Sequence, residues 1–428
     1  MKKIHYLLTF VISLQLLFGQ SHTSISGKVI NHETGEPLPF ATIGITGSSH
    51  GTISNNDGEF EFYIPSSHSK DTLSVSYVGF ETFKVLIDDI QDALNVPLKE
   101  NIIVLEQVEV NGELLTANQI IERALERLKE NYSTKPVIMR GMYRDIRQQN
   151  GETVSLTEAA LDIQDPGITK PRKFFMRGVR ASTSRINPLL KGSLLNSGNS
   201  LVVNLGHSYW LSSLRFRISK IELEIEDVIE QDGEPFYVIT STELVAKDGL
   251  AEKYKDLKYE LVHRYLVHCE TYAIHKIQHL ESPIEGKYVA IEHPYEGDTL
   301  FYSKKGWNQT IELEEFQGKM HLKYHDVNYA FDIVDEKNDE VYLDMAYQFI
   351  FITTQVHTDT TQRPEGQKMN RKKPMALQWK GYDSEFWADP RNAKIVPLTK
   401  KQVQDLEKYQ PLEDQFRSKK TRLKKNSG

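Results

Sequence analysis

Apolar residues fall at every second position in short runs along the first part of this sequence. Turn residues separate the runs between positions 24 and 98, and the apolar members are Ile25, Val29, Ala41, Ile43, Ile45, Phe60, Phe62, Ile64, Leu73, Val75 and Tyr77. A period of two sends successive side chains to opposite faces of a strand, so the runs predict half-buried antiparallel strands. Several such strands in about 75 residues can bury a core only by stacking two sheets.

Four motifs occur in order in this region: residues 25–29 (ISGKV), 33–43 (ETGEPLPFATI), 51–60 (GTISNNDGEF) and 73–80 (LSVSYVGF). Together they resemble the carboxypeptidase regulatory-like domain, which precedes many outer-membrane proteins of Bacteroidetes-type bacteria, including SusC-like TonB-dependent transporters. The resemblance implies a transthyretin-like sandwich at residues 24–98 with no catalytic residues of its own. In those transporters a plug and a barrel follow, whereas here a linker strand at 99–115 leads to a helix. We therefore do not infer transport.

Residues 1–20 have the layout of a secretory signal peptide. Lys2 and Lys3 precede a short apolar stretch at 6–18, which is shorter than the roughly 20 apolar residues of a membrane span. We expect cleavage after about Gln20 and export to the periplasm or the outer-membrane periphery of a Gram-negative bacterium. No later segment is apolar enough for a transmembrane helix in the mature chain, although peripheral association with the outer membrane stays open.

Residues 116–378 are predicted to form a larger antiparallel β domain that begins with one helix. A capping-box pattern at Thr116 and Gln119 starts the helix, and its apolar face is Ile120, Ile121, Ala124, Leu125 and Leu128. Asn150-Gly151 and Asp232-Gly233 then mark two-residue hairpin turns, and roughly ten strands follow the helix. The fold class we expect is mainly β: a sandwich, then a half-barrel-like sheet with one packed helix.

Part of this second domain, at 221–280, resembles half-barrel proteins that carry lipoproteins or lipids across the periplasm, in the spacing of its strand-like runs and turns. The resemblance implies a concave apolar face. The preceding segment, 187–214, is rich in leucine among Gly, Ser and Asn, and two interpretations stay open. It is either a loop packed on the core or a mobile apolar flap over a groove, formed by Leu194, Leu195, Tyr209 and Trp210.

The tail at 379–428 is predicted to be helical and basic. Thr399 and Gln402 repeat the capping-box pattern ahead of a short helix with Val403 and Leu406. The end of the chain carries Lys419, Lys420, Arg422, Lys424 and Lys425, which are interpreted as a solvated terminus.

Charge and cysteine content exclude several classes of function. Lys and Arg number 52 against 59 Asp and Glu, a net charge of −7 without a basic surface, so nucleic acid is not an expected partner. The one cysteine rules out an internal disulfide and a multi-thiolate zinc site.

Histidines offer two candidate metal sites, and both are weak. His293 and Glu296 have the spacing of two carboxypeptidase zinc ligands, but they stand in a turn without the flanking pattern. A four-residue turn at 268–271 would pair Val267 with Tyr272 and place His263 opposite Lys276, which keeps the histidines of this hairpin apart. We expect no metal and no cofactor.

The most suggestive polar group is Tyr143 with Glu158, with Arg144 nearby. A two-residue turn at Asn150-Gly151 places Tyr143 directly opposite Glu158. A structural cross-strand pair is favoured over a general acid or base, since one carboxylate without a positioned partner is no mechanism.

The sequence thus favours an exported, noncatalytic binding or interaction protein of the cell envelope that holds an apolar ligand or an envelope protein. A structural or assembly factor of the outer membrane is the alternative, and a metal-dependent, carboxypeptidase-like hydrolase is the third hypothesis.

Overall fold

The structure is a computed structural model and describes residues 22–91, 93–101, 115–167, 172–185, 221–246, 258–284, 300–335, 340–370, 373–389, 392 and 396–422. These residues form two compact units. The first holds the described residues up to Tyr77, those from Thr82 to Lys99, and Val396 with Pro397; the second holds the others. The predicted signal peptide, most of the linker strand and the flap residues Leu194, Leu195, Tyr209 and Trp210 lie outside the described residues.

The first unit is a sandwich of two small sheets, as the alternation predicts. One sheet has the order β4-β1-β7 and the other β3-β2-β5-β6. The strands are β1 (His22–Asn31), β2 (Thr42–Ile45), β3 (Gly51–Ile53), β4 (Glu59–Pro65), β5 (Thr72–Ser76), β6 (Phe83–Leu86) and β7 (Leu94–Leu98), with short 3-10 turns at Ser66–His68 and Ile87–Asp89. Every second residue of β4 and β5 is buried, so both sheets contribute one face to the core.

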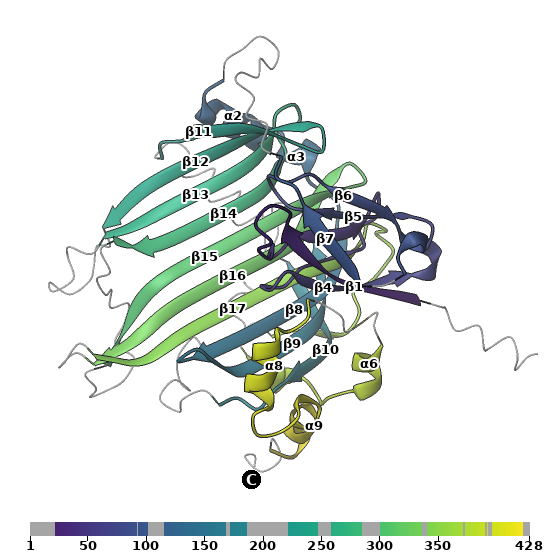
Figure 1. Cartoon of the computed structure of the whole chain (residues 1–428), viewed down its shortest axis with the longest axis vertical. Coiled ribbons are helices and arrows are strands. Elements are labelled where there is room, and N and C mark those ends of the chain that lie inside the picture. The colour runs from purple at the N-terminus through teal and green to yellow at the C-terminus, as the bar shows by residue number, and fades with distance from the viewer. Residues whose placement is uncertain are drawn as a thin grey trace, which may run out of the picture. The chain divides into compact units, whose positions relative to one another are not determined.

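The second unit is built on one open sheet of eleven strands, one more than the sequence suggested. Its order is β11-β12-β13-β14-β15-β16-β17-β8-β9-β10-β18, so the two ends of the sheet do not pair with each other (Figure 1). The strands are β8 (Val137–Gln149), β9 (Glu152–Asp165), β10 (Lys173–Ala181), β11 (Glu224–Gln231), β12 (Glu234–Ala246), β13 (Lys258–His268), β14 (Ile274–Pro283), β15 (Leu300–Phe316), β16 (Lys319–Asp335), β17 (Glu340–His357) and β18 (Gln367–Lys368).

Hairpins with two-residue turns set the starting register of this sheet. Asn150 and Gly151 both have positive φ (51° and 72°), as do Asp232 and Gly233 (57° and 82°). Both residues of a type I′ turn need positive φ, which asparagine, aspartate and glycine tolerate best. Both predicted turns are confirmed, since Gln149 pairs with Glu152 and Gln231 with Glu234.

One face of the large sheet is apolar over nearly its whole width and packs against a helix. Helix α2 (Ala117–Glu126) has the predicted capping box at Thr116 and Gln119, and α3 (Leu128–Asn131) follows it. Ile120, Ile121 and Ala124 are buried against this face. Tyr272 and the turn before β14 receive hydrogen bonds from Arg123, Arg127 and Asn131, which fixes the helix at that end of the strands.

The opposite face of β8, β9 and β10 is covered by helices near the C-terminus: α6 (Ser384–Ala388), α8 (Lys400–Glu407) and α9 (Leu412–Arg422). The short helix α5 (Met375–Gln378) instead packs Met375 into the apolar cluster. Leu406 and Phe416 pack with Ile146 and Leu156. The predicted capping box at Thr399 and Gln402 is present.

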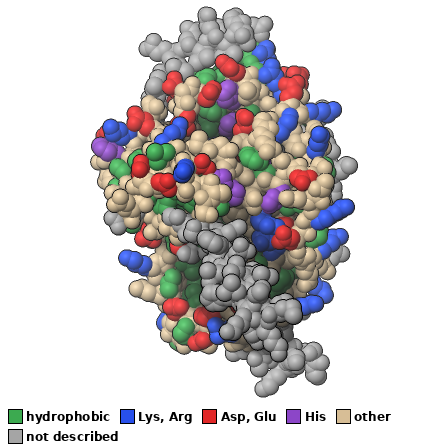
Figure 2. Space-filling view, turned by 90° about the vertical axis from the view of Figure 1, so that its right-hand side faces the viewer, with side chains coloured by type: hydrophobic (Ala, Val, Ile, Leu, Met, Phe, Trp, Pro, Cys, Tyr) green, Lys and Arg blue, Asp and Glu red, His purple; other side chains and the backbone are tan. Residues whose placement is uncertain are grey.

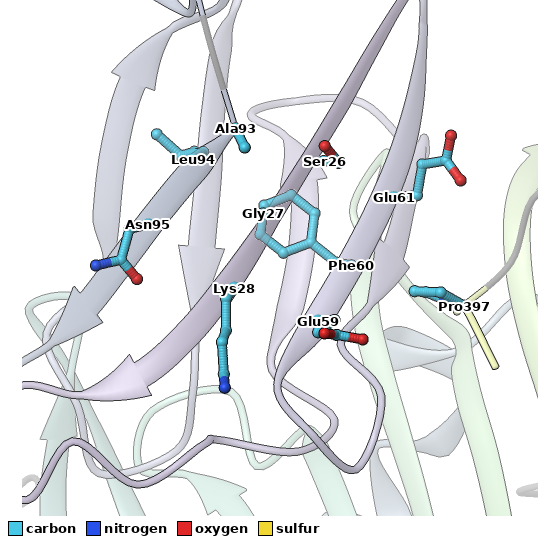
Figure 3. A pocket seen from close by; sticks show the side chains of 10 residues that line it. All are labelled: Ser26, Gly27, Lys28, Glu59, Phe60, Glu61, Ala93, Leu94, Asn95 and Pro397. Carbon is cyan, nitrogen blue, oxygen red and sulfur yellow. The ribbon is translucent and has the colours of Figure 1, made fainter. Parts of the chain in front are cut away.

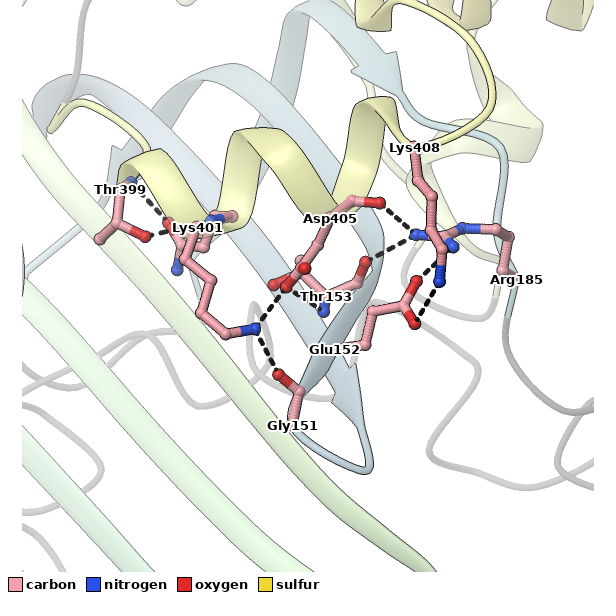
Figure 4. Close-up of polar contacts among 9 residues, drawn as sticks. Gly151, Glu152, Thr153, Arg185, Thr399, Lys401, Asp405 and Lys408 are labelled. Carbon is pink, nitrogen blue, oxygen red and sulfur yellow. Dashed lines mark hydrogen bonds and ion pairs between the residues drawn. The ribbon is translucent and has the colours of Figure 1, made fainter.

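Polar contacts tie α8 to the β8–β9 hairpin (Figure 4). Lys401 Nζ donates to the Gly151 carbonyl at 2.7 Å, and the Thr153 amide donates to the Asp405 carboxylate at 3.0 Å. Lys408 and Arg185 both pair with Glu152. Within the described residues, no helix combines the length and the apolar character that crossing a membrane requires.

Candidate functional site

The predicted pair of Tyr143 and Glu158 does not form. The ladder between β8 and β9 shifts by one residue at Arg147 and Gln148, so Tyr143 lies opposite Ala159 and Glu158 lies opposite Arg144. One extra residue in a strand reverses which face every later side chain occupies. Tyr143 therefore points to the apolar face, where burial raises its pKa well above the usual range. Arg144, expected only nearby, is the direct partner of Glu158.

Glu158 sits between two arginines on the face under the C-terminal helices. Arg144 Nε donates to its Oε1 at 2.7 Å, and Arg180 Nε donates to its Oε2 at 2.6 Å. Burial opposes ionisation of Glu158, but the charges and hydrogen bonds of the two guanidinium groups outweigh it, so its pKa lies below the usual range. The rings of Trp387 and Phe416 lie 4.3 Å and 5.0 Å from the Arg180 guanidinium carbon. The group is thus an ionised, hydrogen-bonded and covered network.

A row of polar side chains crosses the apolar face at one level of the sheet. Ser241, His263, His279 and Gln309 are consecutive partners across β12, β13, β14 and β15. All four are buried. We call these four residues the polar row. On its side toward α2, the next level is apolar and runs through Ile239, Tyr265, Ile277 and Ile311.

The two central histidines of the polar row share a hydrogen bond between their Nδ1 atoms, 3.2 Å apart. The expectation that His263 lies opposite Lys276 is wrong, because Val267 pairs with Ile274 and a register shift follows at Leu266. The turn contains six residues, two more than predicted, and the register shift moves the pairing by one further residue. His263 therefore lies opposite His279, three residues beyond Lys276. Tyr272 adopts a positive φ of 56° in this turn, which a tyrosine seldom does and which the sequence did not signal.

Gln309 extends the polar row to His325 on β16, because its Nε2 donates to the His325 Nε2. Burial, with the nearby Arg172, lowers the pKa of His325 to about 3. The ring is therefore neutral at ordinary pH and accepts this hydrogen bond. The polar row and His325 offer hydrogen-bonding groups, most of them uncharged, within apolar surroundings.

The remaining metal candidates give no assembled site in the part of the chain that is described. His293 and Glu296 lie outside it. Within it, no three His, Cys, Asp or Glu side chains gather closely enough to hold a metal ion. Cys269 is buried as a free thiol, and burial raises its pKa to about 12.

The sandwich carries a pocket of about 390 Å³ on its β4-β1-β7 sheet (Figure 3). The Phe60 ring lies beside Gly27, where an added Cβ would stand 2.7 Å from it, so only glycine leaves room for the ring. Lys28, Glu59 and Pro397 also line the pocket, and the Pro397 carbonyl accepts a hydrogen bond from Asn55. The pocket thus combines an apolar floor with charges of both signs.

Charges of both signs are also mixed on the molecular surface. In the face shown in Figure 2, acidic and basic side chains are interspersed, with several basic ones along the right-hand edge. This agrees with the small net charge of −7.

Comparison with known families identifies the sandwich. Residues 25–110 match the family of CarboxypepD_reg-like domains. This confirms the resemblance drawn from the four motifs, and the CarboxypepD_reg-like domain has the sandwich fold that the resemblance implied. No curated protein matches the sequence.

Three solved structures share features with the chain at low similarity. A DUF1329 family protein from Desulfovibrio piger is 8% identical, covers 58% of this chain and 93% of its own, and has a TM-score of 0.25. A candidate outer membrane lipoprotein-sorting protein domain from Vibrio parahaemolyticus is 11% identical, with coverage of 58% and 95% and a TM-score of 0.24. A candidate membrane-associated protein of unknown function from Bacteroides fragilis is 8% identical, with coverage of 78% and 98% and a TM-score of 0.15. Similarity at this level does not identify a function.

Proposed function

We propose that this chain is an exported, noncatalytic binding protein of the cell envelope that holds an apolar ligand on the apolar face of its large sheet. The observation that carries the proposal is the extent of that face. Its buried apolar residues form one cluster from Tyr237 on β12 to Val179 on β10. A face of this kind, crossed by a few polar groups, is the usual lining of a small-molecule site.

The size of the sheet supports the same conclusion. Helix α2 has 10 residues and is therefore about 15 Å long. Eleven strands spaced about 4.8 Å apart span about 48 Å across the sheet. The helix is therefore much shorter than the sheet is wide, and it contacts the sheet at the end of the strands that holds the turn before β14.

The polar row gives the ligand an expected chemistry. A ligand with a polar end would hydrogen-bond to the polar row while its apolar part contacts Tyr265 and Ile311, which lie at the next level of the same face. We expect a molecule that is mostly apolar with one hydrogen-bonding end.

The test is native mass spectrometry of the full chain after gentle extraction, combined with Val327→Trp. Val327 is buried in the middle of the apolar face, between Gln309 and Phe349. If a ligand occupies this space, the indole displaces it, so the variant stays folded and carries less lipid. Val341→Trp is the control, because Val341 is 47% exposed and the change should alter neither stability nor retained lipid. Wild-type protein that carries no lipid contradicts the proposal.

The alternative, a structural or assembly factor of the outer membrane, is favoured by one observation. Ile120 and Ile121 of α2 are fully buried in the same cluster, so the sheet holds a helix of its own chain. If side chains fill the whole interior, Val327→Trp overpacks it and destabilises the protein by about 1–3 kcal/mol. Co-purification of an envelope protein with the wild-type chain would then support assembly over ligand binding.

Export is the second part of the proposal. We infer that residues 1–20 are removed and that the CarboxypepD_reg-like domain engages an envelope protein. Mass spectrometry of the exported chain should give an N-terminus near Ser21, and a protein recovered uncleaved from the cytoplasm would contradict export.

A further inference from the structure

A second group of charges lies on the helix-covered face. It is centred on Asp162, four residues beyond Glu158 on β9 and on the same face of the strand. Arg140 on β8 binds Asp162 with two hydrogen bonds of 2.9 Å and 3.0 Å. Arg177 on β10 is 3.8 Å from the same carboxylate. The carboxylate of Glu365 bridges both arginines, with Oε1 at 3.0 Å from Arg140 and Oε2 at 3.5 Å from Arg177.

The two carboxylates of this group differ in their surroundings. The Asp162 side chain is 0% exposed, and its oxygens already accept the two bonds from Arg140 and one from the Glu365 amide. The Glu365 side chain is 62% exposed. Two guanidinium charges thus face one buried carboxylate, and the second negative charge comes from a side chain that water reaches.

The backbone at Glu365 is held in place without its carboxylate. Its amide donates to Asp162 Oδ2 at 2.9 Å. The next residue, Gly366, has a positive φ of 97°, and a Cβ there would stand 2.1 Å from the Met176 carbonyl oxygen. Only glycine permits this approach to β10. The carboxylate can therefore leave the arginines while the segment stays docked.

Three further groups lie beside the arginines. The side-chain oxygen of Asn392 accepts a hydrogen bond from Arg177 Nη2 at 2.7 Å. His357, at the end of β17, has a buried Nε2 atom with no hydrogen-bond partner in the structure. Burial and the charge of Arg140 lower its pKa, while Asp162 and Glu365 oppose that change. The Phe386 ring lies 5.8 Å from the Arg177 guanidinium carbon. The group thus has a vacant hydrogen-bonding atom and an apolar wall.

We propose that Arg140 and Arg177 form a binding site for the carboxylate of an external ligand, and that Glu365 fills this site when the ligand is absent. Guanidinium groups bind carboxylates with planar, paired hydrogen bonds, as Arg140 does with Asp162, and each arginine also contacts one oxygen of Glu365. The site lies on the face opposite the polar row and is independent of the proposed function. A tethered carboxylate acts at an effective concentration in the millimolar range or above, so external carboxylates bind the wild type only weakly.

The test removes the tethered group and supplies free ones. Acetate and octanoate are titrated into the full-length mature chain, wild type and Glu365→Ala, at constant ionic strength against chloride, with binding followed by calorimetry. Acetate stands for a small free acid and octanoate for a fatty-acid carboxylate. We expect the variant to bind at least about tenfold more tightly than the wild type. Tightening with octanoate alone assigns the site to fatty acids; equal tightening with both assigns it to the carboxylate itself.

Glu226→Ala is the matched control. Glu226 binds Arg264 with two bonds of 2.8 Å and 2.6 Å, so its removal also frees one guanidinium group, but an exposed one. The control should show no tightening. The double variant Glu365→Ala with Arg177→Lys keeps the charge, and we expect it to lose the gain because the planar donor is gone.

Three results would overturn the inference: equal affinity in wild type and Glu365→Ala, equal tightening in Glu226→Ala, or full retention of the gain in the double variant. Crystals of Glu365→Ala soaked in 4-bromobenzoate, a carboxylate whose bromine is not displaced by side chains, give an independent readout. An anomalous bromine peak beside Arg140 and Arg177 supports the site, and a fully occupied ligand elsewhere with none there contradicts it.

Discussion

Replacing Glu158 with glutamine isolates the energy of the buried network under the C-terminal helices. The amide keeps the shape of the side chain but removes the charge that Arg144 and Arg180 share. Breaking a buried ion pair by removing one partner costs about 3–5 kcal/mol, because an uncompensated charge stays buried. Glu158 is 1% exposed and faces two arginines, so we expect Glu158→Gln to lower the free energy of unfolding of the second unit by at least about 3 kcal/mol.

Urea unfolding measures this loss without changing ionic strength. Because the pKa of Glu158 in the folded chain lies below its unfolded value, its contribution is complete above the unfolded value of about 4.3. It disappears as the pH falls through the folded pKa, so the difference between variant and wild type should shrink in acid. Glu226→Gln, at the exposed pair with Arg264, should cost within about 1 kcal/mol. A loss below 1 kcal/mol at pH 7 for Glu158→Gln would refute the reasoning.

Three further predictions concern single sites. Gly27→Ala should unfold the sandwich at lower urea, because the new Cβ would stand 2.1 Å from the Leu94 carbonyl oxygen, whereas Gly306→Ala meets nothing closer than 3.5 Å and should be nearly neutral. Thr116→Ala should cost about 1 kcal/mol through loss of the α2 cap, measured by thermal unfolding with circular dichroism. Burial raises the pKa of Asp326 to about 7, so the wild type should lose up to about 4 kcal/mol of stability as the pH rises from 4 to 7. Asp326→Asn should not show this loss. If urea unfolding gives the same pH dependence for both proteins, the prediction is contradicted.

The elements of this fold are largely predictable from sequence because their signals are local. The alternation in residues 24–98, the capping boxes at Thr116 and Thr399, and the Asn150-Gly151 turn each involve neighbours in the chain. The structure contains all of them. Local patterns therefore determine where elements begin and which turns join them.

Register is harder to predict, because it depends on bulges that leave no local signal. The shift beside Arg147 and Gln148 moves Glu158 from Tyr143 to Arg144. The longer turn before β14 and the shift at Leu266 bring His263 to His279. The net displacement is one residue in the first case and three in the second, and because both numbers are odd each reverses a face. The candidate residues were visible in the sequence, but their grouping was not.

The bulges also explain why the two faces of the sheet have different chemistry. Without the shift in β8 and β9, Glu158 and Asp162 would share a face with Tyr143 and enter the apolar cluster, where an unpaired carboxylate costs several kcal/mol. Arg177 and Arg180 are an odd number of residues apart and would point to opposite faces in a regular strand. The bulge between Met176 and Gly178 turns both toward the helix-covered face. That single irregularity in β10 supplies one arginine to Glu158 and another to the site that Glu365 occupies.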